Sequence, residues 1–312
     1  MKKYIIIIIV IIISYFIGYY NQPIQSKITE SRLKSTYQYI NPLLECDNGS
    51  ISQNTNLDKL KNTIKSLTSD NQTSVYYRDM NNGPWFGINE KELFSPASLV
   101  KVPLMMAFLK KAESDPLILD KEILNTEKYD PTTQNIQPLI TIIPNQKYTI
   151  RQLIEQMIIY SDDVSYTILN NQLSAAEITK VYSDLGVDIS QAQSNPNGNI
   201  LSVKSYASFF RILFNASYLN RDMSEYALKL LSQVKFKDGL VAGVPNNIIV
   251  SHKFGERQYL DTGLKQLHDC GIVYMPNKPY LLCIMTRGND FKTMESIIKN
   301  ISETIYSGLL DN

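Results

Sequence analysis

In this 312-residue chain, Ser98 and Lys101 have the residue types and the spacing of a nucleophile and a base. They lie within residues 94–109, which we predict to form a helix opening at Ser95-Pro96, because proline suits the first helical position. Three residues apart, the two side chains share one helical face. Backbone N–H groups of a first turn lack acceptors within the helix, so an oxyanion beside Ser98 would meet donors. A lysine that loses hydration can take a proton from a neighbouring hydroxyl, which makes Ser98 a candidate nucleophile and Lys101 its base.

Two later segments carry polar residues in a suggestive order. Ser161-Asp162-Asp163 follows at the end of a predicted helix, and His252-Lys253-Phe254-Gly255 follows on a predicted strand. A single match decides little, because Ser-x-x-Lys and Ser-Asp each occur four times in the chain. The order, spacing and structural context of the three segments therefore carry the interpretation.

The elements that must position these residues follow from capping signals and periodicity. After a first helix over residues 57–67 and the Ser98 helix, five more helix starts are predicted. They are Thr149 with Gln152, Ser174 with Glu177, Ser202, Asp222 with Glu225, and Asp290. Extended segments are expected near both ends of the chain, at residues 73–78, 85–88, 248–254, 270–275 and 280–286. This order predicts an antiparallel sheet built from both chain ends and flanked by helices, with an inserted all-helical region over about residues 102–245.

The N-terminal residues predict attachment to a membrane. Lys2 and Lys3 precede an uncharged, mostly isoleucine run over residues 4–20, long enough to cross a bilayer. We interpret residues 1–22 as an uncleaved single-pass anchor whose charges stay inside, which places the rest of the chain outside the cell membrane. A cleaved signal peptide is the alternative, although no small-x-small site follows the run. Residues 23–56 would form a juxtamembrane stalk, and residues 57–312 the folded domain.

Composition limits the function further. A formal charge of +1 with mixed signs gives no basic stripe, so we expect no nucleic-acid partner. Cys46, Cys270 and Cys283 are a sparse, odd set that implies no disulfide framework, and we expect them to be buried as small apolar residues. With His252 and His268 as the only histidines, no motif supports a Ser-His-Asp triad, and metal-ligand spacing is missing. Neither a metal nor a cofactor is therefore expected.

In this order and context, the three motifs resemble those of the serine β-lactamases and penicillin-binding proteins, and within them class A β-lactamase-like proteins. The resemblance covers roughly residues 57–308 and includes the closing strand, hairpin and helix. It implies an α/β fold of the α+β kind, β-lactamase/transpeptidase-like.

The resemblance also implies roles for individual residues. Ser98 would form the acyl-enzyme, Lys101 would act as its base, Ser161 would relay a proton to the leaving nitrogen, and Lys253 would supply positive charge for a substrate carboxylate. Substrate would contact Asp163, Phe254, Gly255 and Glu256, with the backbone N–H groups of Ser98 and Glu256 forming the oxyanion hole.

Three departures from the family pattern affect these expectations. Residues 186–199, where a class A enzyme carries its water-activating glutamate, contain no glutamate, and Asp188 is their only acid. Asp163 replaces an asparagine amide that can donate, and Phe254 replaces a hydroxyl residue. Deacylation and ordinary β-lactam recognition are therefore both in question.

The sequence predicts a membrane-anchored serine hydrolase, β-lactamase-like or D,D-peptidase-like, acting on a β-lactam or a D-Ala-D-Ala-type cell-wall peptide. The alternative is a degenerate, membrane-tethered binding module for a cell-wall peptide or a protein partner. The sequence leaves the oligomeric state open.

Overall fold

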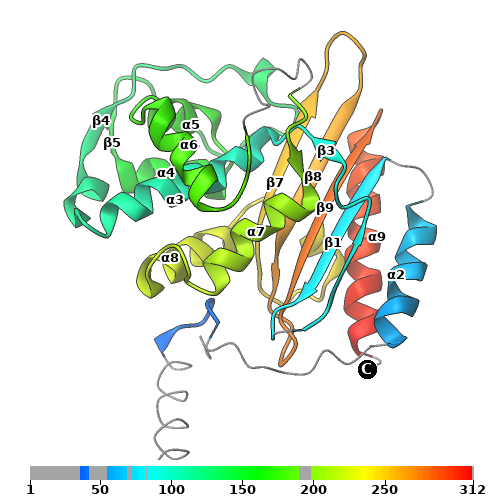
Figure 1. Cartoon of the computed structure of the whole chain (residues 1–312). Coiled ribbons are helices and arrows are strands. Elements are labelled where there is room, and N and C mark those ends of the chain that lie inside the picture. The colour runs from blue at the N-terminus through cyan, green and yellow to red at the C-terminus, as the bar shows by residue number, and fades with distance from the viewer. Residues whose placement is uncertain (1–35, 42–54, 69–71, 82, 190–197, 311–312) are drawn as a thin grey trace, which may run out of the picture.

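The central feature of the fold is a five-stranded antiparallel sheet in the order β2-β1-β9-β8-β7. The structure is a computed structural model and describes residues 36–41, 55–68, 72–81, 83–189 and 198–310 (Figure 1). The strands are β1 (Thr73–Asp79), β2 (Trp85–Ile88), β7 (Val250–Gln258), β8 (Lys265–Val273) and β9 (Tyr280–Gly288). Strand β1 pairs with β9, so both ends of the domain meet in one sheet, which confirms the predicted α+β class.

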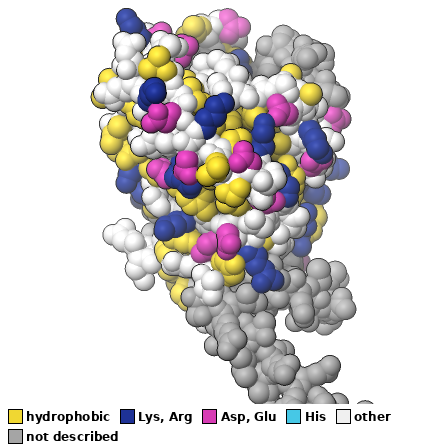
Figure 2. Space-filling view, turned by 90° about the vertical axis from the view of Figure 1, so that its left-hand side faces the viewer, with side chains coloured by type: hydrophobic (Ala, Val, Ile, Leu, Met, Phe, Trp, Pro, Cys, Tyr) yellow, Lys and Arg dark blue, Asp and Glu magenta, His cyan; other side chains and the backbone are white. Residues whose placement is uncertain are grey.

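Helices cover both faces of this sheet (Figure 1). On one face lie α2 (Thr55–Leu67) and α9 (Phe291–Leu310), and α9 buries Met294, Ile298, Ile301 and Ile305. On the other face α7 (Val203–Phe214) packs against the sheet and leads into the helical region. The face of the molecule on that side intermingles both signs of charge with apolar side chains (Figure 2).

Three helices of the helical region begin where the capping signals predict. Capping boxes open α4 (Ile150–Ile159) at Thr149 and α6 (Ala175–Asp184) at Ser174, and Ser202 caps α7. The Asp222 prediction was wrong: Asn220 caps α8 (Arg221–Ser232) by accepting from the N–H of Met223. The Glu225 carboxylate instead accepts the backbone N–H groups of residues 38, 39 and 40. Part of the predicted stalk therefore lies against α8.

Short strands interrupt the insertion that was predicted to be all-helical. Within it, β4 (Glu122–Leu124) pairs with β5 (Lys147–Thr149), and β6 (Leu201–Ser202) pairs with β3 (Leu93–Phe94) outside it. Segments of two or three residues are too short to show an alternating pattern, which explains why the sequence did not reveal them.

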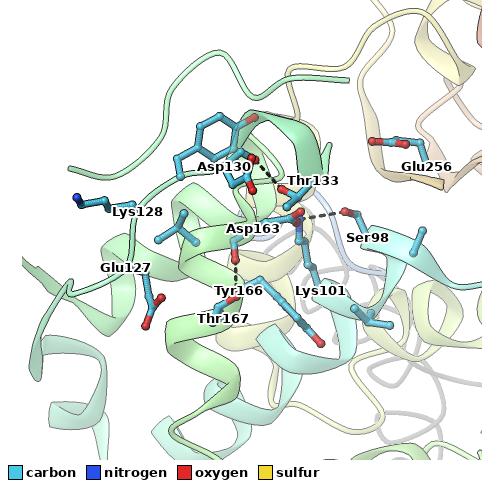
Figure 3. A pocket seen from close by; sticks show the side chains of 14 residues that line it. Ser98, Lys101, Glu127, Lys128, Asp130, Thr133, Asp163, Tyr166, Thr167 and Glu256 are labelled. Carbon is cyan, nitrogen blue, oxygen red and sulfur yellow. Dashed lines mark hydrogen bonds and ion pairs between the residues drawn. The ribbon is translucent and has the colours of Figure 1, made fainter. Parts of the chain in front are cut away.

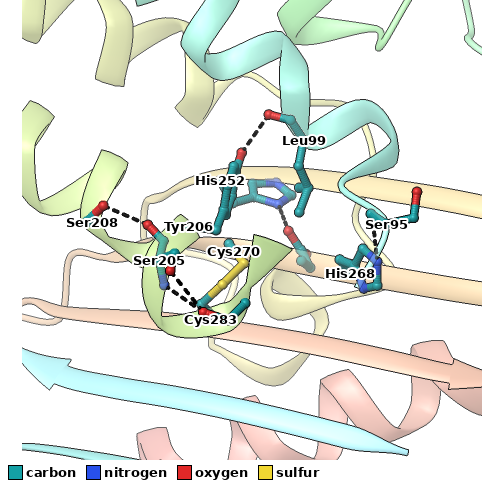
Figure 4. Close-up of a disulfide and its surroundings, with 11 residues drawn as sticks. Ser95, Leu99, Ser205, Tyr206, Ser208, His252, His268, Cys270 and Cys283 are labelled. Atoms are coloured by element: carbon teal, nitrogen blue, oxygen red, sulfur yellow. Dashed lines mark hydrogen bonds and ion pairs between the residues drawn. A yellow bond between two sulfur atoms is a disulfide. The ribbon is translucent and has the colours of Figure 1, made fainter. Parts of the chain in front are cut away.

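A disulfide corrects the expectation for two of the cysteines. Cys270 on β8 and Cys283 on β9 are directly opposed in the antiparallel register and form a buried disulfide with a Cα–Cα distance of 3.9 Å (Figure 4). The turn between β8 and β9 sets this register, so the hairpin was the signal for the pairing. Cys46 lies outside the described residues.

Within the described residues, no helix is both long enough and apolar enough to span a bilayer. The predicted anchor over residues 1–22 lies outside them, as does most of the predicted stalk.

Candidate active site

The turn that carries Ser98 is a 3-10 helix rather than the predicted α-helical start. Residues Ala97–Val100 form this turn, and the α-helix α3 (Lys101–Ala112) begins directly after it. Ala97 has a φ of 45°, an unfavourable left-handed conformation for a residue with a Cβ. Such backbone strain persists where the surroundings hold it, and here it lies beside the proposed nucleophile.

Pro103 explains the change of helix type. Lacking an N–H, it cannot bond to the carbonyl of Leu99, four residues earlier. Tyr206 of α7 supplies the missing donor, with its hydroxyl 3.1 Å from the Leu99 oxygen (Figure 4). The helix is therefore irregular beside Lys101, and the Leu99 carbonyl receives a hydrogen bond from another helix.

Strand β7 approaches the Ser98 turn very closely at Gly255. A Cβ built on Gly255 would lie 3.0 Å from the Pro96 carbonyl oxygen and 3.1 Å from the backbone nitrogen of Leu99. A side chain at this position would push the strand away from the turn. The absence of a side chain at Gly255 therefore allows β7 to lie this close to the Ser98 turn.

Ser95 fixes the chain entering the turn. Its N–H donates to the side chain of Gln266 at 2.9 Å, and its carbonyl accepts from Nε2 of His268 at 3.0 Å. Burial lowers the pKa of His268 to about 4, so the imidazole is neutral at pH 7 and donates from Nε2 (Figure 4). His268 is therefore part of the support beneath the nucleophile.

The Lys101 ammonium lies at the centre of the site. Only 1% of the residue is exposed, and its Nζ lies 3.0 Å from Ser98 Oγ, 2.7 Å from the Ser161 carbonyl, 3.1 Å from Ser161 Oγ and 2.5 Å from Asp163 Oδ1. Burial lowers its pKa, and the carboxylate of Asp163 opposes that shift. Lys101 thus contacts both the nucleophile hydroxyl and a carboxylate in a dry environment.

Lys253 is fully buried on β7 and donates to Ser161 Oγ at 2.9 Å and to the carbonyl of Phe254 at 2.8 Å. Burial lowers its pKa well below the usual value, and the neighbouring Lys101 charge lowers it further. The ring of Phe254 is also buried, 4.4 Å from the ring of Phe236 between centroids. The Lys253 Nζ lies 4.3 Å from the Phe254 ring centroid, so this aromatic side chain packs against the cation.

The consecutive residues Asp162 and Asp163 have different roles and different exposure to solvent. Asp162 caps α5 (Asp163–Asn170) through the N–H of Ser165 and is fully buried, and burial raises its pKa. Asp163 is the first residue of that helix, and 35% of its side chain is exposed. Ser161 precedes them with a φ of 59°, a second strained position beside the proposed nucleophile.

A cavity of about 500 Å³ opens over this cluster (Figure 3). Of the residues predicted to form the site, Ser98, Lys101, Asp163 and Glu256 line it, while Ser161, Lys253, Phe254 and Gly255 are buried outside its lining. A cavity of this size is ordinary for a small-molecule or peptide-end ligand.

The sequence did not reveal the residues that line the other wall of the cavity. Glu127, Lys128, Tyr129, Asp130 and Thr133 lie there, within the long segment between β4 and β5. Gln134 follows them and donates from Nε2 to the Ser161 carbonyl at 3.0 Å. The segment has no periodicity and no motif, so nothing in it marked these residues.

No group of three or more His, Cys, Asp or Glu residues that could hold a metal ion occurs in the described parts of the chain. Nδ1 of His252 lies 2.8 Å from Oδ1 of Asp269. Both side chains are fully buried, and neither lines the cavity that contains Ser98.

A buried lysine beside a serine on a strained turn, with a second serine and lysine behind it, defines a serine hydrolase of the β-lactamase-like kind. A family model described as the Beta-lactamase enzyme family matches residues 58–309, so the chain belongs to this family. Comparison with curated proteins gave no match.

Solved structures share the fold at low sequence identity. PBP-A aligns with a TM-score of 0.67 and 21% identity over 82% of this chain and 97% of its own. An acyl-enzyme complex of a PBP-A variant with penicillin G gives a TM-score of 0.68 and 22% identity over 82% and 98% of the two chains. The class A β-lactamase from Bacteroides cellulosilyticus DSM 14838 aligns at 0.69 and 19% identity over 83% and 100%.

Proposed function

We propose that the protein is acylated at Ser98 by a β-lactam or by a cell-wall peptide ending in D-Ala-D-Ala. The observation that carries the proposal is the 3.0 Å contact between Ser98 Oγ and the Nζ of buried Lys101. A catalytic base must lie within hydrogen-bond reach of the proton that it removes, and Lys101 meets this condition.

In acylation, neutral Lys101 takes the Ser98 proton while Oγ attacks the acyl carbon. The carbonyl electrons move onto oxygen, where the backbone N–H groups of Ser98 and Glu256 stabilise the oxyanion. Collapse expels the leaving nitrogen, which receives its proton from Ser161, while Ser161 recovers a proton from the Lys101 ammonium 3.1 Å away. Lys253 stabilises the charge that develops on Ser161 Oγ through their 2.9 Å contact. The product is an ester between Ser98 and the acyl group.

Deacylation is proposed to be slow. Residues 186–199 contain no glutamate that could activate water. Asp163, the cavity carboxylate in contact with Lys101, is engaged in an ion pair. PBP-A, whose variant is seen as an acyl-enzyme with penicillin G, is a relative of the same fold and makes a lasting adduct a reasonable expectation.

The burial of Lys253 and Phe254 weakens recognition of the carboxylate that ordinary β-lactams and D-Ala-D-Ala peptides both carry. A lysine with no exposed surface offers little to a substrate carboxylate, and Phe254 has no hydroxyl to help it. A degenerate binding module remains the second candidate, supported by the same two residues and by Asp163 in place of an amide.

The location proposed for the enzyme is the outer face of the cell membrane, with residues 1–22 as a single-pass anchor. The charged start and the isoleucine run support this proposal. Protease protection of the full-length chain in intact cells would test it, since an external domain is digested and an internal one is not.

The decisive experiment for acylation is intact-protein mass measurement after incubation with penicillin G and with a D-Ala-D-Ala peptide. We expect an adduct on the wild type that persists for minutes and is absent from Ser98→Ala. A wild type that stays unlabelled by every acylating agent would leave the binding module as the better reading. Rapid turnover without an adduct would refute slow deacylation.

A further inference from the structure

Residues 134–136, here called the strap, join the two walls of the cleft. On the helical side, Gln134 donates to the Ser161 carbonyl at 3.0 Å. On the sheet side, the Asn135 backbone N–H donates to Oε1 of Glu256 at 2.7 Å, its side-chain Nδ2 donates to Oε2 at 2.8 Å, and the Ile136 N–H reaches Oε1 at 3.3 Å. Three consecutive residues thus bond to both sides of the catalytic cluster.

The position of Glu256 places this contact beside the cavity that contains Ser98. In Figure 3, Ser98 lies between Asp163 and Glu256, and the Glu256 carboxylate points towards the wall that carries Asp130 and Thr133. Glu256 and Thr133, the residue before the strap, line the cavity together with Ser98, so the strap joins two parts of the cavity's edge.

Hydrogen bonds from Gln137, the residue after the strap, also hold this segment in place. Nε2 of Gln137 donates to the carbonyls of Pro131 and Gln134 at 2.7 and 2.6 Å, and Gln137 accepts from the hydroxyl of Tyr129. The bonds from Asn135 and Ile136 to Glu256, by contrast, lie near the surface, with Asn135 itself exposed. If the strap opens, these exposed bonds are the ones that break first.

We propose that the strap is a specificity filter that restricts the acyl donor to slender, unbranched acyl groups. This inference rests on acylation of Ser98, the proposed function. A narrow chain passes beneath the strap, whereas a bulky or branched group reaches Ser98 only when the bonds to Glu256 are broken. A strap open for about a tenth of the time slows a bulky donor about tenfold and leaves a slender one unaffected.

The test compares two fluorophosphonates that share one warhead, one with an ethyl chain and one with a branched biphenyl group. The phosphonylation rate of Ser98 is measured for each by intact-protein mass, and the readout is the bulky-to-slender rate ratio. Asn135→Pro removes both donors of Asn135, and the extended backbone of Gln134 suits a following proline. Asn135→Ala removes one donor, and Asn300→Ala, on the exposed side of α9, is the matched control.

We expect the ratio to rise about tenfold in Asn135→Pro, less in Asn135→Ala, and not in Asn300→Ala. Glu256→Gln should raise it as well, because an amide presents N–H groups to the strap donors. If both probes label the wild type and the ratio is unchanged in all strap variants, the filter is refuted while the proposed function stands. If neither probe labels wild-type Ser98, the proposed function itself fails.

Discussion

The floor and the rim of the cleft are built in opposite ways. The floor, made of Ser98, Lys101, Ser161 and Lys253, is a dense set of hydrogen bonds in which both lysines are buried. The rim, residues 127–137 with Glu256, is mostly exposed and carries charges of both signs. The floor can set the chemistry of the bond broken, while the rim can only select which molecule presents that bond.

If this division holds, substitutions in the floor change the rate for every acyl donor. Substitutions at the rim change the ranking among donors. The following predictions test the division, from the largest expected effect to the smallest.

Lys101→Ala should reduce the acylation rate of Ser98 by about 10²- to 10⁴-fold for every donor, because the proton acceptor is lost. Stopped-flow measurement with a chromogenic β-lactam or ester would give the rate. Lys111→Ala is the matched control, since Lys111 lies on the same helix and pairs with Glu177 at the surface. A loss of comparable size in Lys111→Ala would mean that α3 had been disturbed rather than its base removed.

His268, which donates to the Ser95 carbonyl next to the Ser98 turn, should make the fold sensitive to acid. The folded pKa of His268 is about 4, against 6.5 for the unfolded chain, so between these values the unfolded chain holds the extra proton. The shifted pKa of His268 therefore contributes to the free energy of unfolding. This contribution is fully present above pH 6.5 and is lost as the pH falls towards 4, by up to about 3 kcal/mol.

Urea unfolding at pH 7 and at pH 4.5 measures that loss. His268→Gln keeps a side-chain N–H donor for the Ser95 carbonyl but cannot take up the proton, so its stability should fall less over the same range. Equal losses in the wild type and in His268→Gln would place the acid sensitivity elsewhere in the molecule.

Asp163, at the border between floor and rim, should control the pH dependence of acylation. Its carboxylate raises the pKa of Lys101 against the effect of burial, so Asp163→Asn should lower that pKa and leave more neutral lysine at pH 7. The rising limb of the acylation rate against pH should move to lower pH, and a shift of one unit corresponds to about a tenfold faster rate on that limb. A limb that stays in place or moves to higher pH would show that Asp163 does not act on Lys101 through charge.

Local signals in the sequence predicted the sheet and the floor. Capping boxes at Thr149 and Ser174 and the amphipathic last helix depend on neighbouring residues, and the structure has them as predicted. Ser98, Lys101, Ser161 and Lys253 could be brought together because three motifs in order indicated the fold. The catalytic roles given to them stay predictions.

What the sequence could not supply were contacts between distant segments. Tyr206 bonding to Leu99, Glu225 bonding to residues 38–40, and Asn135 bonding to Glu256 each join parts of the chain that share no local pattern. The start of α8 was also misplaced: Glu225, expected to complete a capping box with Asp222, bonds to residues far earlier in the chain, and Asn220 caps the helix.

The contact between Glu225 and residues 38–40 also decides where mechanical load enters the molecule. These residues lie beneath α8 (Figure 1), and the Tyr274 hydroxyl donates to the Tyr39 carbonyl at 2.9 Å. A pull on the chain before Thr36 is therefore resisted first at α8 and at the residue after β8. The strand β1 and helix α2, which follow in the chain, are shielded from that force as long as the Glu225 contacts hold.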